Sequence, residues 1–139
     1  YAVPIASDQF PAEFEYDRVQ FETALWDTGC DYDRLRHLSY SETRVFCFFR
    51  TVDEPEYPEI VASHWNSEVE QCNCMGAPKF LIGLKTDLRY YPRVVKEFAA
   101  RGIKPSTKED GDETAKRIGA VKYLECSSYT NEGVKEVCE

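Results

Sequence analysis

Two long apolar runs constrain the fold of this chain more than any other feature of its sequence. The segment 44–50 is apolar between its two terminal arginines and rich in aromatic residues, and the segment 78–84 is similarly apolar. Strands that are buried on both faces, as in a parallel sheet, have this pattern. We therefore expect a strand buried on both faces over 44–50 and a buried strand over 78–84, in a mostly parallel sheet.

The segments around these runs predict an alternating order of strands and helices. Apolar and more polar residues alternate over 19–26, which is typical of a strand, and another strand is expected over 119–125. Helical spacing is found in 58–72, with Val61, Trp65, Val69 and Cys72 on one face, and in 93–101 and 112–118, which end at Gly102 and Gly119. The segment 105–111 is expected to be a polar loop, and Thr130 to cap a last helix. This order indicates an α/β fold with right-handed crossovers.

Length and charge narrow the class of protein. A chain of 139 residues suits a single domain, and 42% hydrophobic residues are enough to build a core. The formal net charge of −8 disfavours a nucleic-acid partner. No apolar run reaches the length of a membrane-spanning helix.

The cysteines favour a reduced, cytoplasmic protein over a disulfide or zinc framework. Cys47 and Cys126 lie in apolar strand-like runs, where buried thiols are common, and Cys72-x-Cys74 lacks the spacing of a zinc site. Cys138 is next to the last residue and is not placed for prenylation, so no membrane anchor is expected in this chain.

Two acidic residues follow expected strands, where an open α/β sheet binds its ligands. Asp27 comes at the end of the strand expected over 19–26 and precedes Thr28-Gly29, although a lone Asp-Thr-Gly is more often a simple turn. Lys85 and Asp87 follow the strand over 78–84. If the extended conformation continues, the two-residue alternation sends both of these side chains to the same side.

The flanking residues resemble those of the Rho/Rac family of small GTPases. Leu25-Trp26-Asp27-Thr28 followed by 31–40 is similar to the second switch of that family, with two residues missing in between. Leu84-Lys85-Thr86-Asp87 resembles its guanine-reading motif, and 119–128 resembles the strand and loop that follow in Rac. The resemblance implies a Ras-like three-layer P-loop NTPase fold and a signalling switch that acts on the cytoskeleton.

The resemblance also implies site residues, with GTP or GDP and Mg²⁺ as cofactors. Asp87 would accept hydrogen bonds from guanine, Lys85 would pack on its ring, and backbone N–H groups of Ser127 and Ser128 would contact its carbonyl. Asp27 would hold magnesium through water, and Gly29 would lie in the nucleotide-binding turn. Rho-type regulators or effectors would contact the second-switch residues Tyr32, Arg34 and Leu35.

Several family features are absent from these 139 residues. The phosphate-binding Gly-x-x-x-x-Gly-Lys-Ser/Thr loop, the threonine of the first switch and the catalytic glutamine are not found, so no catalytic residue is assigned. Ser7–Pro11 resembles the end of the family's first helix and the turn after it, so the central first strand is expected to be missing. We expect one Rho-type domain over 1–139, incomplete at both ends. It is either a GTP-binding switch with impaired binding and hydrolysis or a non-cycling pseudo-GTPase that binds regulators or effectors.

Overall fold

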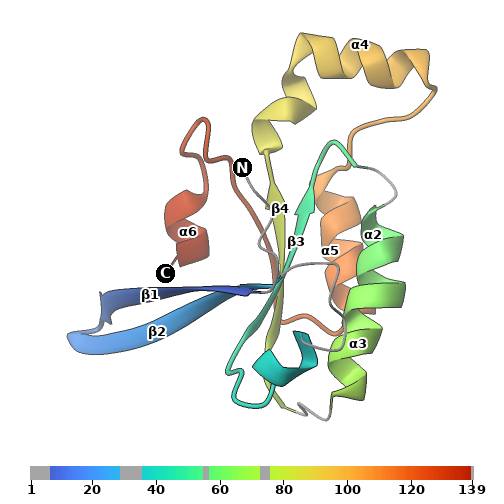
Figure 1. The fold of residues 1–139 in the computed structure, drawn as a ribbon. Helices are drawn as coiled ribbons and strands as arrows, with labels where there is room; N and C mark the ends of the chain where they lie inside the picture. Colours follow the sequence, from blue (N-terminus) through green and yellow to red (C-terminus); the bar gives the residue numbers. More distant parts are fainter. Residues whose placement is uncertain (1–6, 29–35, 55–56, 73–75, 139) are drawn as a thin grey trace. The chain divides into compact units, whose positions relative to one another are not determined.

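The computed structural model of the chain describes residues 7–28, 36–54, 57–72 and 76–138 (Figure 1). The chain divides into two compact units, Tyr1–Thr43 and Arg44–Glu139. The expectation of one GTPase domain over the whole chain stays a prediction.

The first unit contains an antiparallel hairpin of β1 (Ser7–Tyr16) and β2 (Val19–Thr28), which pair from Ser7↔Thr28 to Tyr16↔Val19. The turn between them has left-handed backbone at Asp17 and Arg18, with φ of 49° and 65°. The unit also contains the short 3₁₀ helix η1 (His37–Ser39). The strand expected over 19–26 is confirmed.

The expectation of a helix end and turn at Ser7–Pro11 is wrong, because these residues begin β1. The sequence from Phe10 to Tyr16 alternates between apolar and polar residues, which suits a strand with one apolar face. Pro11 has no N–H for a ladder, but each strand of a two-stranded hairpin has a free edge where a proline is tolerated.

The hairpin has two chemically different faces, because directly paired residues of an antiparallel ladder share a face and successive residues alternate. Over residues 10–25 the first face, which we call the apolar hairpin face, comprises Phe10, Ala12, Phe14, Tyr16, Val19, Phe21, Thr23 and Leu25, and the next pair on it is Asp8↔Asp27. The second, which we call the acidic hairpin face, includes Glu13, Glu15, Gln20 and Glu22.

The second unit is built on a parallel sheet of β3 (Phe46–Thr51), β4 (Lys79–Leu84) and β5 (Lys122–Glu125), in the order β3-β4-β5. The register aligns Phe48 with Leu81, and Leu81 with Tyr123. The predicted parallel sheet is therefore confirmed. Among the described strands β3 pairs with β4 alone, so its other side is a free edge.

The helices of the second unit follow the predicted order. One helical stretch consists of α2 (Tyr57–Ile60), the π segment η2 (Val61–Trp65) and α3 (Asn66–Gln71). After β4 come the 3₁₀ helix η3 (Thr86–Tyr90), α4 (Pro92–Ala100) and α5 (Lys108–Arg117), and α6 (Val134–Cys138) follows β5. The helices α2, α3 and α5 lie on one side of the sheet, and α6 lies on the other (Figure 1).

Helix α5 begins four residues earlier than expected, so residues 108–111 are helical and not loop. The cause is a capping box: Asp110 N donates to Thr107 Oγ1 at 3.2 Å, and Thr107 N donates to the Asp110 carboxylate at 2.8 Å. At the C-terminus Thr130 is not the cap of the last helix, because α6 starts only at Val134. None of the residues of α6 is buried.

The expectation that the strand over 44–50 is buried on both faces is wrong. Phe46, Phe48 and Arg50 of β3 are buried, whereas Cys47 and Phe49 are exposed. The buried side chains face the same layer as the core residues Val61, Leu81 and Ile118. Among the described helices of the second unit none covers the opposite face at β3, where Cys47 and Phe49 are exposed.

Candidate functional site

The loop after β4 turns abruptly at Lys85, whose backbone is left-handed with φ of 57° and ψ of 41°. η3 follows at once, and Leu88 N donates to Lys85 O at 3.0 Å. The extended conformation therefore does not continue, and the expected two-residue alternation of Lys85 and Asp87 is wrong. Lys85 is exposed and Asp87 is half-buried.

The structure brings the Asp87 carboxylate against Ser127, in the loop after β5. Ser127 Oγ donates a short hydrogen bond of 2.5 Å to Asp87 Oδ1. Ser127 is fully buried, its N–H donates to Glu132 O at 2.9 Å, and its Oγ accepts from Thr130 N at 3.2 Å. A carboxylate has about four lone-pair sites, so Asp87 keeps acceptor capacity for a ligand.

Backbone hydrogen bonds hold the two loops together at the carboxyl edge of the sheet. Cys126 N donates to Gly83 O at 2.8 Å, and Thr86 N donates to Cys126 O at 3.4 Å. The loop returns to β5 at Gly133, where φ is +69° and an added Cβ would lie 2.1 Å from Glu125 O. The position requires glycine both for its backbone and for this close approach.

An ion pair that the sequence reasoning missed supports this arrangement. Arg89 donates to both carboxylate oxygens of Glu125, at 2.7 and 3.1 Å, and its Nε donates to Ser106 O at 2.8 Å. The Tyr123 hydroxyl donates to Glu125 Oε1 at 2.8 Å. The sequence signal that could have indicated this ion pair is the position of its members: Arg89 is two residues after Asp87, and Glu125 is two residues before Ser127.

The surroundings of Glu125 keep it charged. Burial raises the pKa of its carboxyl, but the hydrogen bonds from Arg89 and Tyr123, together with the positive charges of Arg89 and Lys108, outweigh burial and hold the pKa below its ordinary value. The hydrogen bond to Glu125 raises the pKa of Arg89. This network therefore links η3, which contains Asp87, to β5, which leads to Ser127.

The remaining predicted site residues are placed as follows. Ser128 is exposed in the same loop as Ser127. Asp27 is exposed at the second-to-last position of β2, in the first unit, and its role as a magnesium ligand stays a prediction. The other predicted positions lie outside the described residues: Gly29, Tyr32, Arg34 and Leu35.

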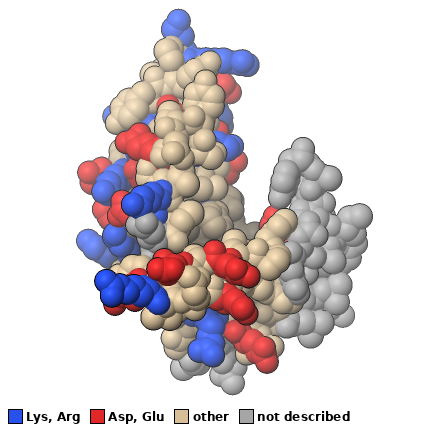
Figure 2. Space-filling view, turned by 90° about the vertical axis from the view of Figure 1, so that its left-hand side faces the viewer, with Lys and Arg blue, Asp and Glu red and all other residues tan. Residues whose placement is uncertain are grey.

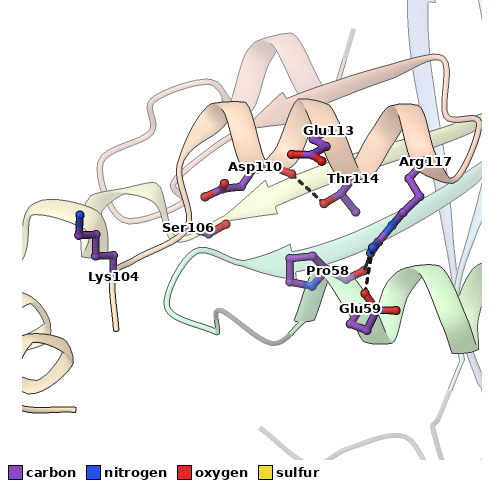
Figure 3. Close-up of a pocket in the computed structure, with 8 residues that line it drawn as sticks. All are labelled: Pro58, Glu59, Lys104, Ser106, Asp110, Glu113, Thr114 and Arg117. Atoms are coloured by element: carbon purple, nitrogen blue, oxygen red, sulfur yellow. Dashed lines mark hydrogen bonds and ion pairs between the residues drawn. The ribbon is translucent and has the colours of Figure 1, made fainter. Parts of the chain in front are cut away.

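A separate pocket of about 400 Å³ lies between α2 and α5 (Figure 3). Arg117 closes one side, with its guanidinium donating to Glu59 at 2.9 Å and to Pro58 O at 2.7 Å. The full lining is Pro58, Glu59, Lys104, Ser106, Asp110, Glu113, Thr114 and Arg117. None of the predicted guanine-binding residues lines it, so the pocket is not the predicted site.

Charged side chains of both signs are interspersed on the face drawn in Figure 2, with uncharged surface between them. Within the described part of the chain, no helix is long and apolar enough to cross a membrane. Cys47, Cys126 and Cys138 are free thiols; Cys126 is buried as expected, but Cys47 is exposed, against the prediction.

The parallel sheet and the joined loops at its carboxyl edge have the order of a Ras-like domain, and comparison with known families agrees. The sequence model described as "Ras family" matches residues 1–139. The chain therefore belongs to the Ras family of small GTPases, and the predicted Ras-like fold is confirmed.

Within that family the chain is similar to Rho-type proteins. It is 45% identical over 139 residues to the GTP-binding protein Rho1 of Kluyveromyces lactis, a match that covers 99% of the chain and 66% of that relative. It is 45% and 43% identical to the GTP-binding proteins rho5 and rho1 of Schizosaccharomyces pombe, each match covering 99% of the chain and, respectively, 69% and 68% of the relative. The chain thus spans about two thirds of the length of these relatives. The predicted Rho membership is confirmed, whereas the closer resemblance to Rac stays a prediction.

Proposed function

We propose that this Rho-type domain retains guanine recognition but binds the phosphates of GTP and GDP weakly, and that it acts in the cytoplasm without cycling nucleotide. The contact between Asp87 and Ser127 carries the first half of this proposal. It fixes a half-buried carboxylate between two loops, where it can accept two N–H groups from the edge of a planar base. Lys85 is exposed beside it, so that its stem can cover the ring.

The second half rests on residues that the 139-residue sequence lacks. No Gly-x-x-x-x-Gly-Lys-Ser/Thr loop and no first-switch threonine are present to hold phosphates. Each charge-assisted hydrogen bond to a phosphate is worth about 1.5–3 kcal/mol, and every 1.4 kcal/mol is about tenfold in affinity. Asp27 alone would contribute little to holding Mg²⁺, and Gly29-Cys30 offers no group to orient an attacking water.

Calorimetric titration of the chain with GDP and GTP, each with Mg²⁺, tests the weak binding. We expect dissociation constants weaker than micromolar and little dependence on Mg²⁺, because phosphate and metal contacts are few. Micromolar or tighter binding would defeat the proposal.

Saturation-transfer NMR with guanosine and adenosine tests the retained base recognition. Wild-type chain is expected to give signal with guanosine only. Asp87→Asn replaces an acceptor with a donor and should abolish that signal. The control Glu113→Gln, an exposed carboxylate on α5, should leave it intact. An equal response to both nucleosides would contradict guanine recognition.

We also propose that the chain binds Rho-type regulators or effectors through Tyr32, Arg34 and Leu35. The resemblance of 31–40 to the second switch favours this function, because protein contacts there do not require hydrolysis. Surface plasmon resonance with a Rho exchange factor should detect binding without added nucleotide. Arg34→Ala should weaken it at least about tenfold, a loss of about 1.4 kcal/mol. The control Arg44→Ala should have no effect, and equal losses from both variants would exclude this surface.

A further inference from the structure

The pocket between α2 and α5 is lined by charges of both signs at different places (Figure 3). Lys104 lies at one end of the lining, and the ion pair of Arg117 with Glu59 lies at the other. Asp110 and Glu113 lie between these ends, three residues apart on α5, so their carboxylates share one side of the helix. The whole lining belongs to the second unit, so the pocket is defined within that unit alone.

Two of these charges, Lys104 and Glu113, are not neutralised by a neighbour. Both residues are exposed, and in the part of the chain that the structure describes neither forms an ion pair. The Asp110 carboxylate accepts from Thr107 N at 2.8 Å, which holds it in place but leaves lone pairs for a ligand. The pocket therefore offers an ammonium group and two carboxylates to a ligand.

Ser106 adds a hydrogen-bond donor that is held in one position. Only 5% of it is exposed, its N–H donates to Val52 O at 3.0 Å, and its carbonyl accepts from Arg89 Nε at 2.8 Å. Its Oγ accepts from Arg50 Nη2. A hydroxyl also has one proton to donate, and no described residue accepts that of Ser106. Because Ser106 lines the pocket, this O–H can serve a ligand there.

The charge of Arg50 lies directly behind this hydroxyl. Arg50 is 1% exposed, and its Nε and Nη1 have no hydrogen-bond partner among the described residues. Asp110 and Glu125 act on it through their charge alone, and Arg89 adds a like charge nearby. A hydrogen bond from a guanidinium polarises the Ser106 O–H and makes it a stronger donor. The pocket wall at Ser106 therefore favours an anionic group.

A ligand with a single charge meets a like charge in this pocket. A plain anion at Ser106 and Lys104 lies beside the carboxylates of Asp110 and Glu113, and a plain cation at those carboxylates lies beside Lys104. A compact zwitterion avoids both conflicts, with its carboxylate towards Ser106 and Lys104 and its ammonium group towards Glu113. The pocket volume of about 400 Å³ is within the usual range for small-molecule sites.

We propose that this pocket is a second ligand site, which binds a free α-amino acid through its carboxylate and its ammonium group. Arg50 is a positioning residue of this site, because it acts through Ser106 and does not line the pocket itself. The proposal is independent of guanine recognition.

NMR titration of the isotope-labelled chain with glycine tests the site. Glycine carries both charges and no side chain, so its binding reports on the charges alone. We expect saturable shifts of the amide signals of Ser106, Glu113 and Thr114 at millimolar glycine. Acetate and methylammonium, each with one of the two charges, should not reproduce these shifts at the same concentration and ionic strength. Equal shifts with either of these ions alone, or none with glycine, would overturn the proposal.

Substitutions at the two ends of the zwitterion provide a second test. Lys104→Gln and Glu113→Gln should each weaken glycine binding about fivefold, as expected for the loss of one exposed ion pair. The controls Lys116→Gln and Glu109→Gln, exposed on α5 outside the lining, should leave binding unchanged. Equal losses in the controls would show that only net charge matters and would exclude the site.

Arg50→Met separates the role of the buried charge in binding from its effect on the fold. The substitution removes the charge behind Ser106 at similar volume. Glycine binding should therefore weaken at least about fivefold, while the circular dichroism spectrum stays that of the folded wild type. Unchanged glycine binding in a folded Arg50→Met would contradict the role of Arg50.

Discussion

Arg50 is the most unusual single residue of the second unit. Only 1% of it is exposed, and its Nη2 donates to Ser106 Oγ, but its Nε and Nη1 have no hydrogen-bond partner. Burial lowers the pKa of its guanidinium, and nearby charged groups such as Asp110 only partly offset this. A buried charge with unsatisfied donors reduces stability, since water would satisfy those donors in the unfolded chain.

Arg50→Met should therefore stabilise the chain. We expect a gain of about 1–2 kcal/mol in the free energy of unfolding, because a similar volume is kept and unsatisfied donors are removed. Urea denaturation followed by circular dichroism measures it. Arg117→Met, at an exposed ion pair, serves as the control and should change stability by less than about 1 kcal/mol. A large loss in Arg50→Met would mean that the charge is compensated in some other way.

Glu125 gives stability a defined dependence on pH. Its folded-state pKa is below the ordinary value of 4.5, so its contribution is complete above that pH and is lost as the pH falls through the lower, folded-state value. Glu125→Gln should cost about 1–3 kcal/mol at pH 7, because Arg89 loses a charged partner. The urea midpoints of wild type and variant should differ at pH 7 and should converge below pH 4.5. The exposed Glu136→Gln is the control, and an acid dependence that persists in Glu125→Gln would contradict this assignment.

At the scale of elements, the loop from Ser127 to Gly133 shows how β5 positions the site. Gly133 and Gly102 have nearly the same φ, +69° and +68°, but only Gly133 approaches other atoms closely. The two glycines therefore separate the effect of backbone conformation from that of steric contact.

Gly102→Ala should cost about 1–2 kcal/mol, the usual penalty for a left-handed residue with a Cβ. Gly133→Ala should cost clearly more, because its Cβ would lie 2.1 Å from Glu125 O and the loop must move. Thermal unfolding of both variants measures the difference. The NMR signal from guanosine should be lost in Gly133→Ala and kept in Gly102→Ala. Equal losses of stability in the two variants would show that the contact between the added Cβ and Glu125 O does not destabilise the fold.

Elements with a strong local signal could be predicted from the sequence. The strands over 44–50 and 78–84 and the helix stops at Gly102 and Gly119 depend on neighbouring residues, and the structure has them. The left-handed turn at Lys85 and the capping box of Thr107 were missed, because a lysine rarely adopts that backbone and Asp110 was assigned to a loop. The pairing of Asp87 with Ser127 joins residues 40 positions apart, so only the family resemblance anticipated that these residues act together.

At the scale of the whole molecule, the two units differ in how much core they contain. The second unit buries side chains from a three-stranded sheet and several helices, with Leu81, Val52 and Val61 fully buried. The hairpin of the first unit has large apolar side chains exposed on one face. Which faces of a strand are covered depends on other elements, which is why the half-exposed β3 could not be predicted from its own sequence.

Hydrogen exchange should show this difference between the two units. Amides of β4, the central strand, should exchange only through the largest unfolding event, whereas those of β1 and β2 should exchange orders of magnitude faster. Uniform protection of all five strands would show that the two units unfold as one.

Among the described strands β3 has one free edge, and this edge has a consequence for the polypeptide in a cell. The edge belongs to a run, Val45-Phe46-Cys47-Phe48-Phe49, that contains no proline, lysine or acidic residue to block further strand addition. Segments of this kind seed amyloid-like aggregates when they are left open. We therefore expect newly synthesised chains to depend on chaperones, and their abundance to be limited by quality control more than by synthesis.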